Sequence, residues 1–467
     1  MFHPGLASES PSPVEPAIMK RYDRVIGAFS PPSSVRRPFF AMTPYPNVFR
    51  LRQTFEAPRV DDIVGRLRAE LARLDLRAKI EPRQTVAVTV GSRGIANLSL
   101  ILRALVASLK DLGAEPFLVP AMGSHGGATA EGQRRVVESY GITEATVGCP
   151  ILSSMETVVL HETDEGFPVH FDRLAHEADH VVVCNRVKPH TMFTGDIQSG
   201  LLKMMLIGLG KHAGARIYHG AVQDFGFPRV LRIAAEAVLA RESILAGLAI
   251  VENARDETAL IEAVPPERFM EREKELLVLA RRWMPRLPFD QVDLLLVDRI
   301  GKDISGTGMD TNVIGRKFND HAAVEGERPR VTRIALRGLT EATRGNANGL
   351  GMAEFCKSRL LRQTDFTTTR INALTARHVP AAMAPLDYET DREILDAALG
   401  TIGLTAPAEA KVLWIADTLH LDEVVCSTAY LPEARRREDL TILGRPGPMP
   451  LDEEGNLPDF NVGDSLA

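Results

Sequence analysis

The segment "TVAVTVGSRGIANLSLILRALVASLKDLGAEPFLVPA" (residues 85–121) decides the fold. It begins with a short apolar run, 85–90, that predicts a buried strand. Residues 96–113 then carry apolar side chains at helical spacing and end at Gly113, and 116–121 predict another strand. Because a strand, a helix and a strand in this order form a parallel pair covered by the helix, the segment predicts an α/β fold.

The same alternation continues along the chain. Further buried strands are predicted at 180–185, 244–252, 292–298 and 411–417, and further helices at 129–141 and 228–241. A hairpin-like pair of strands is predicted at 155–162 and 166–172. Strands that alternate with helices indicate parallel sheets with helices on their faces.

The elements divide into two groups, and a segment rich in Arg and Pro separates them near residue 288. We therefore expect two domains, each with a largely parallel sheet flanked by helices, and an active site in the interdomain cleft. The expected parts are a Pro/Ser-rich segment (1–45), a catalytic α/β domain (46–288), a second α/β domain (289–437) and an irregular tail (438–467).

Composition excludes several classes of protein. The 467 residues are 45% hydrophobic and 25% charged with a net charge of −6, so neither a nucleic acid nor an anionic membrane is an expected partner. The four cysteines form no C-x-x-C pair, which argues against a zinc ribbon, an iron–sulfur site or a disulfide framework. No secretory signal and no apolar run long enough to span a bilayer is visible, so we expect a cytoplasmic protein. The sequence leaves the oligomeric state open.

Three of the predicted strands end in turns that carry notable polar side chains. Arg93 follows the first strand in "GSRG", His125 follows the second in "GSHGG", and Lys188 and His190 follow the third in "RVKPH". Ligands bind beyond the carboxyl ends of parallel strands, so we expect these side chains to meet in a pocket. The alternative for each histidine is a turn or capping residue, and the sequence leaves it open.

Two other kinds of site have weaker support. His161, His170, Asp172 and His176 lie close together in the sequence, and strand alternation puts His170 and Asp172 on one face, as a pair of metal ligands would be. The alternative is that these side chains are simply the polar residues on the exposed face of a hairpin. The glycines at 208, 210 and 214 suggest a dinucleotide loop, but their spacing differs from G-x-G-x-x-G and favours two helices broken by glycine.

The segment 185–219 is rich in cations. We expect Arg186 and Lys211 to lie on the solvent side of ordinary helices. His190, Lys203 and His219 are the candidates for chemistry in this segment.

Four motifs in order resemble the lactate racemase family, whose members use a nickel-pincer cofactor. They are "GSHGGATAEGQ" (123–133), "VKPH" (187–190), the lysine at 203 and the histidine at 219. The resemblance covers most of residues 85–255 and, more faintly, the second domain.

The resemblance implies a cofactor: a nickel-bearing pyridinium mononucleotide with two sulfur-bearing arms. Lys203 would tether it through a thioamide, and His219, sixteen residues later, would be the protein ligand to nickel. His212 is the rival ligand, although it fits the spacing less well and can simply face solvent. Two sulfurs, a ring carbon and an imidazole nitrogen form the square-planar field that Ni(II) favours.

The resemblance also assigns the acid–base residues. His125 and His190 would take turns in removing the proton from the substrate hydroxyl while hydride leaves the adjacent carbon for the pyridinium ring. Return of the hydride on the other face inverts that carbon, and imidazole titrates in the range that such proton transfer requires. Arg93, with Ser92 beside it, would bind the cofactor near its phosphate.

The chain departs from the family pattern at Val90, Gly126 and Leu202, where the family has an aspartate and two arginines. Lactate is therefore not the expected substrate, and a larger 2-hydroxy acid such as a sugar acid is preferred. Lys188 and the glycine-rich loop at 301–316 supply candidate substrate contacts, and the alternative for the loop is a capped structural element. The candidates in the loop are Lys302, Asp310, Asn312 and Arg316.

The predicted function is that of a racemase or epimerase that inverts C2 of a 2-hydroxy acid. Two alternatives from other classes remain. One is a binding protein that holds the cofactor or a sugar acid without turnover, and it has no need of two catalytic histidines. The other is an NAD-dependent oxidoreductase that uses the glycines between 208 and 214.

Overall fold

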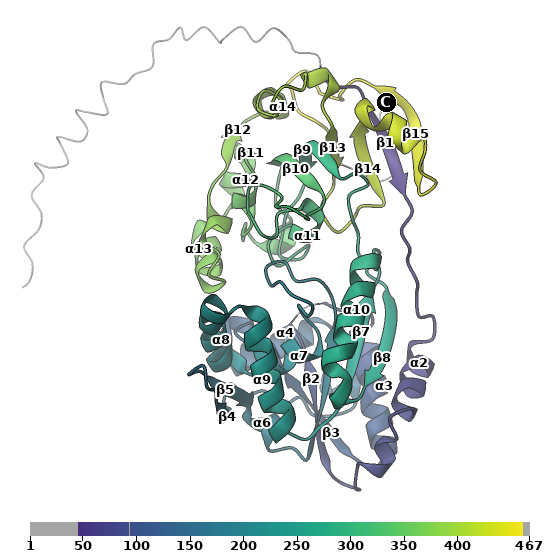
Figure 1. Cartoon of the computed structure of the whole chain (residues 1–467), viewed down its shortest axis with the longest axis vertical. Helices are drawn as coiled ribbons and strands as arrows, with labels where there is room; N and C mark the ends of the chain where they lie inside the picture. The colour runs from purple at the N-terminus through teal and green to yellow at the C-terminus, as the bar shows by residue number, and fades with distance from the viewer. Residues whose placement is uncertain (1–44, 93, 461–467) are drawn as a thin grey trace, which may run out of the picture. The chain divides into compact units, whose positions relative to one another are not determined.

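A computed structural model describes residues 45–92 and 94–460 of the chain. The Pro/Ser-rich segment predicted at 1–45 lies outside the described residues except for Tyr45, and so does Arg93. The described strands form a five-stranded sheet, an eight-stranded sheet and a separate two-stranded hairpin. The two larger sheets are mostly parallel and flanked by helices, which confirms the α/β class (Figure 1).

The five-stranded sheet has the order β3-β2-β6-β7-β8. Its first four strands are parallel and only β8 is antiparallel to its neighbour. The strands are β2 (Thr85–Val90), β3 (Glu115–Pro120), β6 (His180–Arg186), β7 (Ile244–Glu252) and β8 (Thr258–Val264). The strands predicted from the sequence at β2, β3, β6 and β7 are confirmed.

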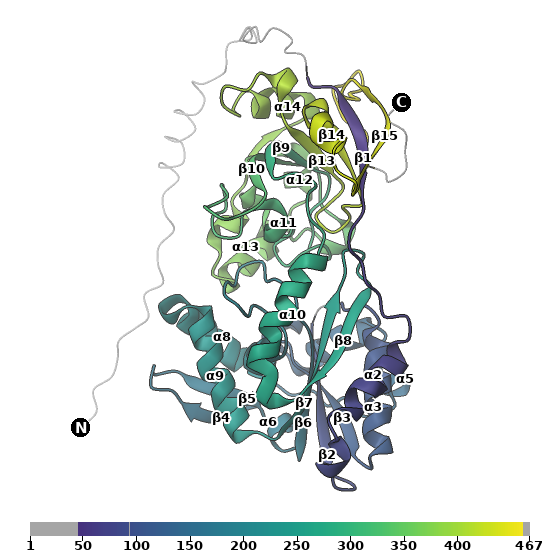
Figure 2. The same ribbon diagram turned by 45° about the vertical axis from the view of Figure 1, so that its right-hand side comes forward.

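Both faces of this sheet are buried. In β6, Val181 and Val183 pack into one apolar cluster while Val182 and Cys184 pack into another, as alternation along a strand requires. Helices cover each face, and this explains why the strands are continuous apolar runs (Figure 2).

The helices of this region are α2 (Ile63–Ala72), α3 (Leu98–Asp111), α4 (Ala130–Ser139), α5 (Glu144–Val147), α6 (Arg173–His176), α9 (Phe227–Arg241) and α10 (Phe269–Trp283). The hairpin strands are β4 (Thr157–Glu162) and β5 (Pro168–Asp172).

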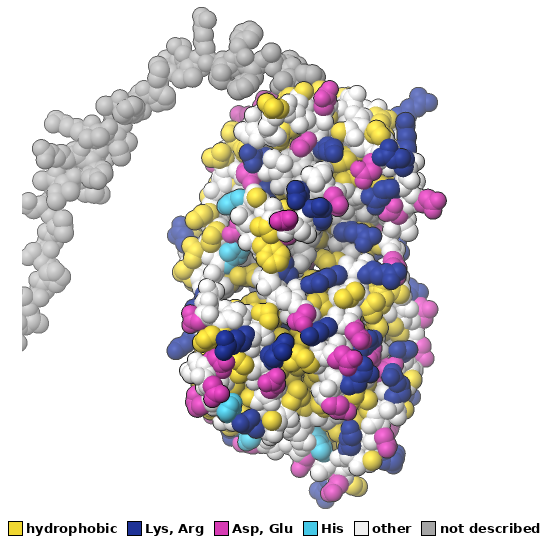
Figure 3. Space-filling model, in the orientation of Figure 1, with side chains coloured by type: hydrophobic (Ala, Val, Ile, Leu, Met, Phe, Trp, Pro, Cys, Tyr) yellow, Lys and Arg dark blue, Asp and Glu magenta, His cyan; other side chains and the backbone are white. Residues whose placement is uncertain are grey.

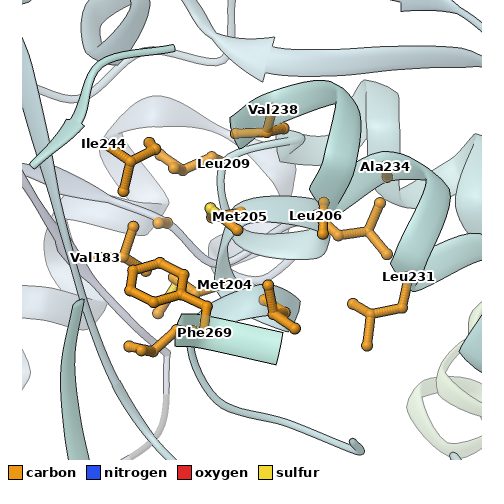
Figure 4. Close-up of a cluster of buried hydrophobic side chains, with 14 of the residues drawn as sticks. Val183, Met204, Met205, Leu206, Leu209, Leu231, Ala234, Val238, Ile244 and Phe269 are labelled. Atoms are coloured by element: carbon orange, nitrogen blue, oxygen red, sulfur yellow. The ribbon is translucent and has the colours of Figure 1, made fainter. Parts of the chain in front are cut away.

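The segment that follows β6 forms the predicted glycine-broken helix pair. A short helix, α7 (Leu201–Lys203), continues as a π-helix, η3 (Met204–Gly208), before α8 (Lys211–Phe225) begins. Single π-helical turns within helices are frequently found at functional sites. Apolar residues of the π-helix pack against β6, α9 and α10, so its position is fixed by the core (Figure 4).

The eight-stranded sheet has the order β12-β11-β10-β9-β13-β14-β1-β15. The five strands from β12 to β13 are parallel, and the remaining three are antiparallel to their neighbours. The strands are β1 (Val48–Gln53), β9 (Gln291–Val297), β10 (Arg330–Leu336), β11 (Phe355–Lys357), β12 (Leu386–Tyr388), β13 (Val412–Ile415), β14 (Glu423–Ser427) and β15 (Leu440–Gly447). Its helices are α11 (Thr311–Ile314), α12 (Ser358–Gln363), α13 (Phe366–Thr375), α14 (Asp391–Leu399) and α15 (Leu431–Ala434).

The edge of this sheet corrects two expectations. The tail that was expected to be irregular from residue 438 contains β15, and β15 pairs with β1 near the other end of the described chain. β1 lies within 46–288 but belongs to the eight-stranded sheet, because its backbone hydrogen bonds run to β14 and β15. The chain passes from one sheet to the other between β8 and β9, on either side of residue 288, and the division into two domains there stays a prediction.

Within the described ranges, no helix is long and apolar enough to cross a membrane. Figure 3 shows Lys and Arg side chains mixed with Asp and Glu over the face that it presents.

Candidate active site

Three turns with polar side chains meet at one edge of the five-stranded sheet. β2 lies between β3 and β6, and all three strands are parallel, so the turns after them emerge at the same edge. His125 Nδ1 forms a hydrogen bond with Ser92 Oγ, which joins the turn after β3 to the turn after β2. The Tyr140 hydroxyl donates to the Ser92 carbonyl oxygen at 2.8 Å and holds that turn from the other side. His190 follows β6, next to them in the sheet order.

The turn that carries His125 is held by a buried side chain below it. The Nε2 of Gln133 donates to the carbonyl oxygens of Gly123 (2.8 Å) and His125 (3.4 Å). Gln133 lies in α4 and is fully buried. Because the backbone of this glycine turn is hydrogen-bonded at Gly123 and at His125, it has little freedom to move. The backbone atoms that carry the His125 side chain are therefore held in place.

Lys211 lies beneath the same turn, and its position corrects the prediction of a solvent-exposed lysine. Its side chain is fully buried, with Nζ 2.7 Å from a carboxylate oxygen of Asp172, which is also fully buried. The same Nζ donates to the Pro120 carbonyl oxygen at 2.5 Å and lies 3.5 Å from Gln133 Oε1. Burial lowers the pKa of Lys211, and the negative charge of Asp172 opposes that change. Lys211 therefore connects β3, β5, α4 and the start of α8.

Arg186 also differs from the expectation of a solvated side chain. It pairs with Glu252 at the end of β7, and only 17% of the arginine side chain and 8% of the glutamate side chain are exposed. His212, the rival nickel ligand, is exposed on α8, where solvent contact explains it.

The imidazole of His190 has a defined hydrogen-bond pattern. Its Nδ1 accepts the backbone N–H groups of Met192 and Phe193, each at 3.0 Å. A ring nitrogen that accepts two N–H groups carries no proton, so the neutral ring in this arrangement has its proton on Nε2. The backbone N–H of His190 donates to Gln198 Oε1 at 3.1 Å, which fixes the residue at the start of the loop.

Phe193 brings three of the predicted site residues together. Its ring stacks on the imidazole of His190 with centroids 4.2 Å apart, and its centroid lies 6.1 Å from that of the His219 ring. Lys203 Nζ lies 5.3 Å from the centroid of the same ring. Phe193 also stacks on Phe227 of α9 at 4.0 Å, so it is firmly packed. Phe193 was not predicted as a site residue, since nothing in "HTMF" distinguishes it from a core aromatic residue.

His219 lies in an environment that favours its neutral form. Burial lowers its pKa, and the positive charges of Lys203 and Arg377 lower it further. A neutral imidazole has a lone pair that can bind a metal ion, whereas an imidazolium has none. The spacing of Lys203 and His219 along the π-helix and α8 thus places an amine and a neutral imidazole on one aromatic ring.

The helix that bears Lys203 is anchored by Glu273 of α10. The carboxylate of Glu273 accepts the backbone N–H groups of Leu201 and, at 3.2 Å, of Leu202. Burial raises the pKa of Glu273 to about 8. A Cβ atom at Gly200 would overlap this carboxylate, and Gly200 has a φ of +96°, so both the space and the backbone require glycine there. Sequence reasoning missed Glu273, because its partner groups are backbone atoms far away in the chain.

A loop of the eight-stranded sheet region contacts the His190 segment. Thr311 Oγ1 donates to the carbonyl oxygen of Thr191 at 2.6 Å, and Asn312 Nδ2 donates to that of His190 at 3.3 Å. Lys317 Nζ donates to Gln198 Oε1 at 2.6 Å, the same oxygen that accepts the His190 N–H. Burial lowers the pKa of Lys317 to about 8, and the nearby Arg281 acts in the same direction. Lys317, which the sequence analysis did not single out, therefore lies one side chain away from His190.

The predicted substrate residues have different surroundings. Lys188 is half-buried, and its Nζ lies 3.9 Å from a carboxylate oxygen of Asp310. Burial lowers the pKa of Lys188. Asp310 caps the first turn of α11 by accepting the Asn312 N–H at 2.9 Å, and Lys302 Nζ donates to the carbonyl oxygen of Gly306 within its own loop. The alternative of a capped structural loop thus describes part of 301–316.

Arg316 requires a correction. Its side chain is fully buried, where it pairs with Glu354 at 3.0 Å and donates to the Met352 carbonyl oxygen. Contacts of this kind hold α11 against the strands of the eight-stranded sheet and leave the guanidinium no access to a substrate. The prediction that Arg316 contacts the substrate is therefore wrong.

The alternative metal site in the β4–β5 hairpin is wrong. Its four candidate ligands have separate partners: Asp172 pairs with Lys211, His170 with Thr157, His176 with Glu242 and His161 with Arg241. Across residues 45–92 and 94–460, no group of three or more His, Cys, Asp or Glu side chains is arranged to hold a metal ion. A metal ion bound by His219 would need its other donors from a ligand.

The glycines at 208, 210 and 214 serve packing. They follow a helix instead of a strand, and a Cβ atom at Gly208 would overlap the Met204 sulfur. A Cβ atom at Gly214 would lie 2.7 Å from the Tyr218 ring. These contacts argue against a dinucleotide loop, which needs a strand before it and open backbone at its glycines.

The turns at this edge of the α/β sheet therefore carry His125 and His190, and His190 shares the Phe193 ring with Lys203 and His219. Residues 49–225 match the family described as the lactate racemase N-terminal domain. This match confirms the resemblance seen in the motifs, and the chain is lactate racemase-like over that segment. No curated protein sequence matches the chain.

Among solved structures, the chain is similar to the lactate racemase apoprotein from Thermoanaerobacterium thermosaccharolyticum. The similarity covers 79% of this chain and 94% of that chain, with 14% sequence identity and a TM-score of 0.49.

Proposed function

We propose that the chain is a racemase or epimerase that inverts C2 of a 2-hydroxy acid. The match of residues 49–225 to the lactate racemase N-terminal domain supports the reaction class. The observation that carries the proposal is the Phe193 ring, because His190, Lys203 and His219 all lie within about 4–6 Å of it. A base, a tether and a metal ligand on one ring can act on a single bound molecule.

The cofactor of the proposal is a nickel-pincer pyridinium mononucleotide, with Lys203 as its covalent tether and His219 as its protein ligand to nickel. The residues present fit this group. Burial and nearby cations lower the pKa of His219 and so favour the neutral ring, whose lone pair can bind nickel, while the other donors to the metal would belong to the cofactor. The chemistry that the cofactor supplies when bound is the reversible acceptance of a hydride from a carbon atom. Ser92 and Arg93 are proposed to bind its phosphate.

His125 is the proposed base for the substrate hydroxyl. Its Nδ1 is engaged by Ser92 Oγ, and a hydroxyl can accept the proton of Nδ1 while Nε2 keeps its lone pair. That lone pair can take the proton from the hydroxyl oxygen as the adjacent C–H bond breaks. Gln133 and Lys211 fix the backbone from which the ring projects.

His190 is the proposed second acid–base residue. With Nδ1 bound to two backbone N–H groups, its Nε2–H is a hydrogen-bond donor that can hold the oxygen on the second face of the carbon. To remove a proton, the ring must release these two N–H groups and protonate Nδ1. Movement of the 191–193 segment is therefore proposed to accompany the proton transfer at His190 in both directions, because forward and reverse inversion pass through the same states.

The substrate is proposed to be an acid larger than lactate, such as a sugar acid. Lys188 and Lys317 flank the His190 segment, and both are half-buried cations that a carboxylate would neutralise. Asn312, Asp310 and Lys302 add polar groups on the side of the eight-stranded sheet, where hydroxyl groups of the substrate could bind.

Replacement of the tether tests the proposal. In the Lys203→Ala variant, incubation with preformed cofactor should give no increase in intact protein mass and no stoichiometric nickel. Lys203→Arg is the matched control, because it keeps the positive charge over Phe193 but cannot form a thioamide. Both variants should lack the covalent adduct that the unsubstituted chain forms. A full covalent and nickel load in Lys203→Ala would remove Lys203 as the tether and, with it, the proposed function.

A further inference from the structure

A pocket lies where the carboxyl ends of strands from the two large sheets face each other. In the five-stranded sheet, β6 and β7 are parallel neighbours, and the turns after them supply Lys188 and Asp256 to the lining. In the eight-stranded sheet, β9 and β13 are parallel neighbours, and the loops after them supply Asp310 and Thr418. Ligands of open parallel sheets bind beyond the carboxyl ends of the strands. The pocket therefore has the position of a ligand site with respect to both sheets.

The strand order of the eight-stranded sheet strengthens this interpretation. From β9 the chain continues through β10, β11 and β12 on one side, and it then returns to β13 on the other side of β9. The loops after β9 and β13 thus part in opposite directions, and the crevice between such loops is the preferred position for a ligand. The backbone N–H of Asp310 donates to Thr418 Oγ1 at 2.9 Å, so the two loops are joined at the lining of the pocket.

The pocket adjoins the segment that carries His190. Lys188 and Pro189 line the pocket and directly precede His190 in the chain. On the opposite side, the Asp310 carboxylate accepts Asn312 Nδ2 at 2.8 Å, and the same amide donates to the His190 carbonyl oxygen at 3.3 Å. One set of contacts therefore holds both the pocket and the backbone of the proposed acid–base residue.

The charges of the lining favour an uncharged group with hydroxyls. Arg186 pairs with Glu252, and Lys188 Nζ lies 3.9 Å from a carboxylate oxygen of Asp310. Asp256 is the third carboxylate, so three acids and two cations leave one negative charge in excess. With the part of the chain that the structure describes, the Asp256 carboxylate forms no hydrogen bond or ion pair. A carboxylate accepts hydrogen bonds from hydroxyl groups and repels a second carboxylate.

The size of the pocket limits what it can hold. Its volume is about 50 Å³. A water-sized group needs roughly 10–15 Å³ by the same measure, so about four such groups fit. Two carbon atoms with their hydroxyl groups make up this number, whereas a nucleotide is far too large.

We propose that this pocket is a specificity subsite that binds the uncharged, hydroxylated end of the 2-hydroxy acid, with Asp256 as the acceptor for its hydroxyl groups. The inference rests on the proposed function, because it takes His190 to act on the other end of the same molecule. It defines the substrate class more closely. The favoured acid has one carboxylate and carries hydroxyl groups at the far end of its chain, and an acid with a carboxylate at each end is rejected.

The first test compares three acids on the full chain without cofactor. Sodium gluconate carries hydroxyl groups at its far end, sodium glucarate carries a second carboxylate there, and sodium 2-hydroxyhexanoate carries neither. Calorimetry should give the highest affinity for gluconate and affinities lower by about tenfold or more for the other two, since one repels Asp256 and the other leaves it without a hydrogen bond.

Substitution of Asp256 gives a result that a loss of folding cannot imitate. Asp256→Asn removes the charge and keeps the size, and asparagine also tolerates the left-handed backbone of this position, which has a φ of +55°. Affinity for gluconate should fall by about five- to tenfold, while affinity for glucarate should rise. Asp164→Asn is the matched control, because Asp164 is exposed in the turn between β4 and β5, outside the lining, and should change neither affinity.

The same ratio of gluconate to glucarate affinity in the unsubstituted chain, Asp256→Asn and Asp164→Asn would overturn the inference. A chain that binds gluconate no better than 2-hydroxyhexanoate would overturn it as well. Neither result depends on the tether. A cofactor load that survives Lys203→Ala would instead overturn the proposed function, while the ratio of the two affinities remains readable. Thermal unfolding of Asp256→Asn shows whether the variant is folded.

Discussion

The two sheet regions differ in how the chain builds them and in what they bring to the candidate site. The five-stranded sheet is formed by one stretch of chain from β2 to β8, and the turns and helices of that stretch carry His125, His190, Lys203 and His219. The eight-stranded sheet combines β1 with strands that all follow residue 290, and its loops carry Lys317 and Arg377. One region thus holds the groups that can move protons or bind a metal, and the other holds cations and hydrogen-bond donors.

This difference separates chemistry from binding. A residue that acts only in the transition state changes kcat, and a residue that holds substrate equally throughout changes KM. We therefore expect substitutions of the proposed acid–base residues of the five-stranded sheet region to lower kcat, and substitutions of the proposed substrate contacts, Lys188 and the loops of the eight-stranded sheet, to raise KM. The comparison would be contradicted by an acid–base variant that changes only KM, or by a loop variant of the eight-stranded sheet that lowers kcat.

The largest effect is expected at the two histidines. His125→Ala and His190→Ala should each lower kcat for inversion at C2 by about 10²–10⁴-fold, the usual contribution of a positioned acid–base group. Nickel content and covalent mass should equal those of the unsubstituted enzyme, because neither residue is the tether or the metal ligand. The measurement is the rate of inversion or of deuterium exchange at C2 over a panel of 2-hydroxy acids.

His212→Ala is the control, since His212 is exposed on α8 and should leave the rate unchanged. Inversion at the unsubstituted rate in either His125→Ala or His190→Ala would remove that histidine from the acid–base pair.

The second effect concerns the buried pair beneath the His125 turn. Lys211→Met leaves the carboxylate of Asp172 buried without its cation, and such losses lower the free energy of unfolding by about 3–5 kcal/mol. Replacement of both partners, as in Lys211→Met with Asp172→Leu, removes the unpaired charge and should recover much of that loss. Urea unfolding of the two variants measures the difference. Equal stability of Lys211→Met and the unsubstituted chain would show that Lys211 does not brace this turn.

These two residues also show where sequence reasoning ends. The strands at 85–90, 180–185 and 244–252 were predicted because their apolar runs are local signals of burial on both faces. The burial of Lys211 was not predictable in this way, since its partner Asp172 comes from a hairpin 39 residues earlier. The pairing of β1 with β15 likewise joins segments almost 400 residues apart, and no periodicity records it.

The candidate site likewise has parts that the local sequence predicts and parts that it does not. Strand order alone predicts that the turns with Ser92, His125 and His190 emerge at one edge. Lys203 and His219 lie only sixteen residues apart, at the end of α7 and within α8, so their spacing is also a local property. Lys317 and Arg377 reach the site from the other sheet region, and only the tertiary structure shows their positions.

The smallest effect is a dependence of KM on pH that belongs to the eight-stranded sheet region. Burial lowers the pKa of Lys317 from its usual value near 10.5 to about 8, so this lysine is charged below pH 8 and loses its positive charge as the pH rises above it. If the charged form holds the substrate carboxylate, KM should be constant at low pH and then rise by about tenfold per pH unit above pH 8. Lys317→Met should raise KM at pH 7 and abolish the rise, with kcat nearly unchanged. A KM that rises equally above pH 8 in Lys317→Met would assign the titration to another group, and a fall in kcat would place Lys317 with the chemistry of the five-stranded sheet region.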